Sequence, residues 1–152
     1  MILELKTFLI AMLPITELRG SIPVALTFYH LPVWSAYLFS VLGNIAPVIL
    51  IISFLEKFSV FLRKNINFFD SFFKWLFEKT RKRHAEKFKK WEELALVMLV
   101  AIPLPFTGAW TGCICSFVFG IPLKKAFPLI TLGCLISGII VTLLTLGITQ
   151  LI

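Results

Sequence analysis

The chain has 152 residues, of which 59% are hydrophobic, with a mean hydropathy of +0.94 and a formal net charge of +7. This composition is far more apolar than that of an average soluble domain, so a soluble globular fold is excluded. Three segments, residues 36–55, 94–119 and 126–152, contain no charged residue. Because about 20 apolar residues span a bilayer as a helix, the sequence predicts an all-α integral membrane protein.

The first apolar segment, residues 7–29, is broken near its middle by Pro14, Gly20 and Pro23. These residues argue against one continuous helix, so we predict a re-entrant helical hairpin that enters from the outer face. Glu17 and Arg19 are expected on a loop at its tip. Ser21 is predicted to cap a half-helix that begins at Ile22, with Pro23 in the first turn.

Residues 34–55 are predicted to cross the membrane from outside to inside. The connector that follows, residues 56–93, holds eleven Lys or Arg and six acidic residues. An excess of basic residues marks the cytoplasmic side of a membrane protein. We expect one helix to end near Lys64 and a second, amphipathic helix over residues 70–92, whose basic face contacts anionic lipids.

Residues 94–119 are broken between Pro103 and Gly112. If Lys124 and Lys125 are cytoplasmic like the connector, this segment enters and leaves on the same side, as a second re-entrant hairpin. Residues 126–152 then cross outward. The alternative is four plain spans with proline kinks, which would place both lysines outside.

The two halves of the chain echo each other at an offset of ninety positions. The matched residues include Pro32 and Pro122, Ala36 and Ala126, and Gly43 and Gly133. Paired, interrupted hydrophobic segments in corresponding positions are typical of transporters built from inverted repeats. We therefore predict a single membrane domain over residues 1–152, with repeats at 7–55 and 94–152 joined by the cytoplasmic connector.

Glu17 and Arg19 are the only ionisable side chains deep in the apolar halves. A charge at membrane depth costs about 2.5–3.5 kcal/mol on insertion scales, so such residues indicate a functional site. With Thr111 as the cap of the matching half-helix, two positive helix ends would face the centre and favour an anion. The alternative is that Glu17 and Arg19 only bridge the hairpin loops and hold the fold.

The predicted substrate- or proton-binding residues combine the charged pair with residues that shape both breaks: Glu17, Arg19, Pro14, Gly20, Pro23, Thr107, Gly108, Trp110 and Gly112. Trp110 is open to two interpretations, a packing anchor or a substrate platform. No catalytic template or cofactor fingerprint is found, so neither enzyme activity nor a cofactor is expected. His30 and His84 lack metal-ligand spacing, and the three cysteines are interpreted as packing residues.

Two motifs carry a resemblance to a known family: Pro14-x-x-Glu17-Leu-Arg19-Gly20-Ser-Ile-Pro23, and Ile102-Pro103-Leu-Pro105-Phe-Thr-Gly108-Ala-Trp110-Thr-Gly112. They resemble the putative small multidrug export protein family of prokaryotes. That family is similar in outline to the DedA/VTT group, whose two opposed re-entrant hairpins bear carboxylates and arginines and are linked to proton-coupled movement of lipids. Here the second tip has no acid or arginine.

We therefore expect a multi-pass transporter of the prokaryotic inner membrane, a small-molecule or drug exporter with a midplane site and possible proton coupling. A DedA-like lipid or lipid-phosphate flippase or scramblase is one alternative, and a non-transporting scaffold is another. The expected partners are the bilayer, a small amphipathic or phosphate-bearing ligand and a second copy in a homodimer, but no nucleic acid.

Overall fold

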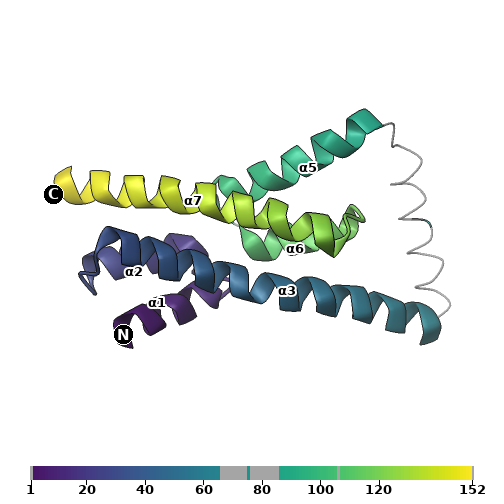
Figure 1. The fold of residues 1–152 in the computed structure, drawn as a ribbon, viewed down its shortest axis with the longest axis horizontal. Coiled ribbons are helices and arrows are strands. Elements are labelled where there is room, and N and C mark those ends of the chain that lie inside the picture. Colours follow the sequence, from purple (N-terminus) through teal and green to yellow (C-terminus); the bar gives the residue numbers. More distant parts are fainter. Residues whose placement is uncertain (1, 66–74, 76–85, 106, 152) are drawn as a thin grey trace.

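The computed structural model describes residues 2–65, 75, 86–105 and 107–151. Within these residues all regular structure is helical: α1 (Ile2–Met12), α2 (Glu17–Thr27), α3 (Val33–Asn65), α5 (Glu86–Ala101), α6 (Ala109–Val118) and α7 (Leu123–Leu151). Each half of the chain has the same order, two short helices and then a long one (Figure 1). The prediction of an all-helical protein is confirmed for this part of the chain.

The long helices are the two that can cross a membrane in the described part of the chain. The apolar parts of α3 and α7 cover 26 and 28 residues, or about 39 Å and 42 Å at the usual helical rise. By contrast α1, α2 and α6 have 11, 11 and 10 residues, so each is only about 15–17 Å long. The predicted breaks thus separate distinct helices, and neither broken segment forms one continuous rod.

The long helices α3 and α7 pack side by side and run in opposite directions (Figure 1). The pair α1–α2 lies towards the end where α3 begins, and the pair α5–α6 lies towards the end where α7 begins. Helix α1 packs on α3 as α5 packs on α7, while α2 and α6 each touch both long helices. The two pairs of short helices therefore meet in the middle of the bundle.

Two glycines set how closely each pair approaches its long helix. A Cβ on Gly43 would lie 2.2 Å from the carbonyl oxygen of Phe8 in α1, and one on Gly133 would lie 2.6 Å from Cβ of Val100 in α5. Both glycines are ten residues beyond the first residue of their helix, so both crossings lie about 15 Å from the start of the long helix. The echo between Gly43 and Gly133 in the sequence corresponds to the same packing in space.

The connector differs in part from its prediction. Helix α3 ends at Asn65, close to the expected Lys64, but α5 runs without interruption from Glu86 to Ala101, through the expected boundary near residue 93. No Gly or Pro interrupts this stretch, and the helix ends two residues before Pro103, as the restriction before proline requires. Most of the helix predicted over 70–92 lies outside the described residues.

Both predicted helix caps are wrong. Helix α2 begins at Glu17 after Thr16, and α6 begins at Ala109 after Gly108; neither N-cap residue makes a side-chain cap bond. Ser21 and Thr111 therefore lie inside their helices. The caps were assigned on the assumption that each half satisfies its own helix ends, whereas the N-terminus of α6 is bonded by a side chain from the other half.

Pro23 is also displaced from its predicted place. It is the seventh residue of α2 rather than part of the first turn. A proline has no N–H, so the carbonyl of Arg19 lacks the donor that a helix normally provides four residues later. The helix starts earlier than predicted because the chain turns at Glu17 itself.

Candidate functional site

Glu17 is placed by an unusual backbone conformation. Its φ is +44°, a left-handed value that costs about 1–2 kcal/mol in a residue with a side chain. Its N–H still bonds the carbonyl of Leu13 at 3.0 Å, so Glu17 ends one helical turn and begins α2. The side chain is buried, with 4% of the residue exposed. A strained and buried carboxylate is retained only where other contacts hold it.

The carboxylate of Glu17 lies at the N-terminus of α6. Its Oε1 accepts a hydrogen bond from the N–H of Trp110 at 3.3 Å. A Cβ on Gly108 would lie 1.7 Å from Oε2, and Gly108 itself has a φ of +143°. Glycine is therefore required here twice, for its conformation and for the space that the carboxylate fills. The acid neutralises the partial positive charge of the helix end.

Arg19 binds the loop between α5 and α6 through its guanidinium. Its two terminal nitrogens donate to the carbonyl oxygens of Leu104 and Thr107, and Nη2 lies 3.7 Å from Oε2 of Glu17. The hydroxyl of Thr107 lies 2.7 Å from the carbonyl oxygens of Ile102 and Leu104, which holds the loop in shape. The guanidinium thus binds main-chain atoms, as a planar donor fork allows.

Trp110 connects the two halves in the opposite direction. Its indole Nε1 donates to the carbonyl of Met12 at 3.2 Å. Met12 is the last residue of α1, where carbonyl groups have no partner within the helix. The side chains of α2 therefore bond the second break, and a side chain of α6 bonds the first.

The structure brings five of the predicted site residues together: Glu17, Arg19, Thr107, Gly108 and Trp110. The prediction that Glu17 and Arg19 lie on a loop is wrong, because both are in the first turn of α2. Residues two apart on a regular helix do not face each other. The pair meets because the positive φ of Glu17 departs from regular helix geometry.

The remaining four predicted residues shape the surroundings. Pro14 lies in the turn between α1 and α2, and Pro23 lies within α2. A Cβ on Gly20 would meet Cβ of Thr16 at 2.8 Å. One on Gly112 would meet Cγ2 of Val100 at 2.6 Å, so α6 lies close against α5. That any of the nine residues binds substrate stays a prediction.

The predicted anion site differs from the arrangement found. Helices α2 and α6 do begin at the two breaks. However, the N-terminus of α6 is filled by the carboxylate of Glu17. An external phosphate would have to displace this acid before it could use the helix end.

Sequence reasoning missed two groups of contacts. The carbonyls of Met12, Leu104 and Thr107 are main-chain atoms, so no residue type could have revealed them. The second is a buried amide: Nδ2 of Asn44 lies 3.6 Å from Sγ of Cys134, and these residues are ninety positions apart. The sequence did offer a signal for this contact. Asn44 is a polar residue in a charge-free segment, and Cys134 stands at the matching position ninety residues later.

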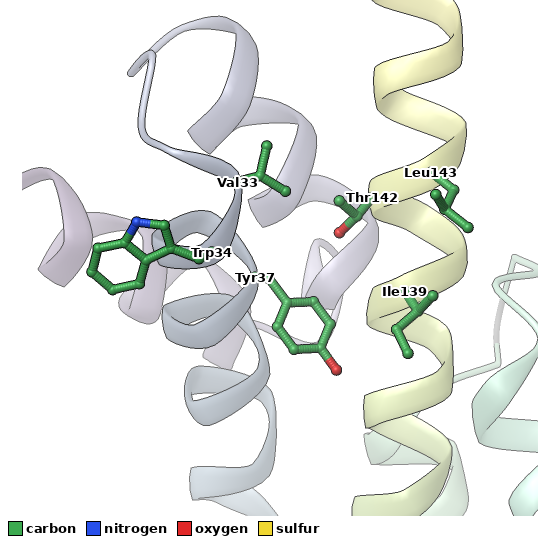
Figure 2. A pocket seen from close by; sticks show the side chains of 6 residues that line it. All are labelled: Val33, Trp34, Tyr37, Ile139, Thr142 and Leu143. Atoms are coloured by element: carbon green, nitrogen blue, oxygen red, sulfur yellow. The ribbon is translucent and has the colours of Figure 1, made fainter.

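A groove lies between α3 and α7, away from the charged pair. It has a volume of about 580 Å³ and is lined by Val33, Trp34, Tyr37, Ile139, Thr142 and Leu143, none of them charged (Figure 2). Tyr37 points from α3 towards α7 and donates its hydroxyl to the carbonyl of Leu135 at 3.1 Å. The hydroxyl of Thr142 is bonded to the carbonyl of Gly138 at 2.7 Å. The hydroxyls of Tyr37 and Thr142 are thus bonded to main-chain carbonyls, and the other lining side chains are apolar or aromatic.

The two apolar helices, and the ion pair of α2 that is bonded to the segment between α5 and α6, are features of a small helical membrane protein. The sequence profile of the family described as "Putative small multi-drug export protein" matches residues 17–140, and the chain belongs to this family. The matched region begins at Glu17, within the first break, and includes the whole of the second. No curated protein and no solved structure matches the chain.

Proposed function

We propose that this protein exports small molecules across a membrane, with its working site where the two broken segments meet. In this proposal α1–α2 and α5–α6 are re-entrant hairpins that enter from opposite faces, as inverted copies. The lengths of the helices support this placement. The crossings at Gly43 and Gly133 lie about 15 Å from the starts of the long helices, half of a hydrocarbon core of about 30 Å.

The orientation is supported by one surface contact. Nζ of Lys125, near the start of α7, lies 3.2 Å from Oε1 of Glu93 in α5. Residues 94–119 therefore begin and end near one another, as a hairpin that enters and leaves on one side requires. In this proposal that side faces the cytoplasm, in keeping with the excess of basic residues in the connector. The prokaryotic inner membrane remains part of the proposal.

The observation that carries the proposal is that the carboxylate of Glu17, from one half, occupies the N-terminus of a helix in the other half. Buried charges are rare in membrane segments and are typical of transport pathways. A proton or a cationic substrate group would compete for this carboxylate with Arg19 and the N–H of Trp110. When Glu17 is so occupied, α6 loses its neutralising acid and the connection between the hairpins weakens.

This mechanism favours an amphipathic substrate with a cationic group over one with a phosphate. The acid attracts a cation directly, whereas a phosphate finds the helix end already filled. The description of the family as drug exporters agrees with this direction. Proton coupling would follow if protonation of Glu17 accompanies each opening of the hairpins.

Flux measurements in proteoliposomes test the proposal. We expect protein-dependent efflux of ethidium, a cationic probe, and a loss of at least tenfold in Glu17→Gln and Arg19→Lys. Glu93→Gln is the matched control, because it removes an acid outside the site. A parallel assay with fluorescent phospholipid separates export from lipid scrambling. Wild-type flux in a folded Glu17→Gln variant would remove this residue from the mechanism.

A purely structural role for the pair has its own support, since the carboxylate of Glu17 and the guanidinium of Arg19 are bonded to protein groups. Under that alternative, the flux of the Glu17 and Arg19 variants falls in proportion to their loss of stability. A variant that unfolds at the wild-type temperature but transports tenfold less would exclude it.

A further inference from the structure

The outer side of the two breaks is exposed and apolar. We define this as the tip surface, formed by Leu13, Pro14, Ile15, Ile102, Leu104 and Pro105. Ile15 is 90% exposed, the largest value among the exposed large hydrophobic residues that the structure describes. The two breaks are bonded to each other through the guanidinium of Arg19 and the carbonyl of Leu104.

Exposed apolar side chains are ordinary on a protein surrounded by lipid, but the backbone of the tip surface is not. In the part of the chain that the structure describes, no hydrogen bond reaches the N–H or the C=O of Ile15. Pro14 has no N–H to contribute, and neither Pro14 nor Ile15 is in a helix. A polar backbone group left without a partner in hydrocarbon costs several kcal/mol.

The depth of this turn argues against bulk water as the hydrogen-bond partner of the N–H and C=O of Ile15. Ala11, four residues before Ile15, packs against Gly43, and Gly43 lies about 15 Å along α3. In the proposed placement the turn is therefore near the middle of the bilayer. Irregular backbone is tolerated there only when it lines a water-filled cavity or is buried in protein. The six side chains of the tip surface are apolar, so a wet cavity on this side is disfavoured.

We infer that a second copy of this chain covers the tip surface, with Ile15 near a twofold axis. Protein atoms can pack against the apolar side chains and also supply hydrogen-bond partners to the turn, which lipid tails cannot do. A twofold interface uses the same patch on both copies, so one exposed turn completes the other. The inference rests on the membrane placement in the proposed function, and it adds the surface and the partner.

Disulfide trapping at matched depth tests this surface. Ile15→Cys is compared with Leu42→Cys and Leu132→Cys, which lie beside Gly43 and Gly133 and are 47% and 48% exposed. The variants are reconstituted in liposomes over a 100-fold range of dilution and oxidised with copper phenanthroline. We expect Ile15→Cys to form a dimer at every dilution, and the two controls to form it at least tenfold less.

A second measurement keeps the inference testable if the cysteine variant does not fold. Single-molecule photobleaching of labelled protein in liposomes gives the dissociation constant of the dimer. We expect Ile15→Ala to raise it at least tenfold and Leu42→Ala to leave it unchanged. A monomer at all dilutions, or equal trapping through Leu42, would overturn the inference.

The outcome is separable from that of the proposed function because neither measurement involves transport. Monomers whose ethidium efflux depends on Glu17 would refute the covered tip and leave export standing. Dimers trapped through Ile15, with flux independent of Glu17 and Arg19, would support the covered tip surface and refute the proposed transport site.

Discussion

The two pairs of short helices, α1–α2 and α5–α6, stand in the same order along the chain but contribute different groups to the contact between them. The pair α1–α2 supplies the two charged side chains of the central contact, Glu17 and Arg19, whereas the segment from α5 to α6 binds them with main-chain groups, the carbonyls of Leu104 and Thr107 and the N–H of Trp110. Both charges of this pair are therefore bonded to peptide groups of the second half. The second break has no acid or basic residue. Its main-chain groups bind the charged side chains of the first break instead.

The two halves are alike in how a short helix packs on a long one. Gly43 and Gly133 allow the same close approach of a short helix to a long one, at the same distance from the helix start. The packing at these glycines is thus alike in the two halves, while the polar groups differ. Five single variants and one double variant, ordered from the largest expected effect to the smallest, test this division.

Replacing Arg19 by Met should have the largest effect on stability. The change keeps a long side chain but leaves Glu17 without its cation and two carbonyls without a donor. Removing one partner of a buried pair costs about 3–5 kcal/mol, and the partial exposure of Arg19 argues for the lower end. Thermal unfolding followed by size-exclusion chromatography measures the loss.

The double variant with Glu17→Gln sharpens this test. If the two residues act as one unit, the second substitution should recover part of the stability lost in the first. Fully additive losses would show that Glu17 and Arg19 contribute independently.

Gly108→Ala should lower stability by about 3 kcal/mol, because alanine is strained at this φ and its Cβ would displace the carboxylate of Glu17. Gly147→Ala is the control, since a Cβ there meets nothing within 4 Å. The same thermal assay applies to both. Equal unfolding temperatures would contradict the contact between Gly108 and Glu17.

Gly43→Ala and Gly133→Ala should each cost about 1–3 kcal/mol through overpacking, with the larger loss at Gly43. The nearest atom to a Cβ at Gly43 is a backbone oxygen, at 2.2 Å, which cannot rotate away. At Gly133 the nearest atoms belong to the side chain of Val100. Side-by-side denaturant titrations rank the two variants, and a reversed order would show that α1 yields more easily than α5.

Glu93→Gln should have the smallest effect, within about 0.5 kcal/mol, because exposed ion pairs contribute little. The side chain of Lys125 is 61% exposed and that of Glu93 is 32% exposed. A shift in unfolding temperature of the size expected for Arg19→Met would mean that the contact between Glu93 and Lys125 stabilises the fold as much as the central pair does.

The sequence determined the broad plan because that plan depends on local properties. Charge-free stretches predicted the apolar helices, Pro and Gly predicted the breaks, and the ninety-residue echo matched Gly43 with Gly133, which occupy equivalent packing positions in the structure. The rarity of Glu17 and Arg19 in an apolar setting singled out the pair. Each of these signals lies in residue type and spacing, which a reader of the sequence can see.

Only the tertiary structure decided how the halves bond. The caps predicted at Ser21 and Thr111 were wrong because each half was assumed to satisfy its own helix ends. In the fold, Glu17 bonds the N–H of Trp110 and Arg19 bonds the carbonyls of Leu104 and Thr107. Backbone donors and acceptors are identical in every residue, so their partners across 85 or more positions cannot be read from residue type. The positive φ of Glu17, which brings the pair together, is fixed by those same distant contacts.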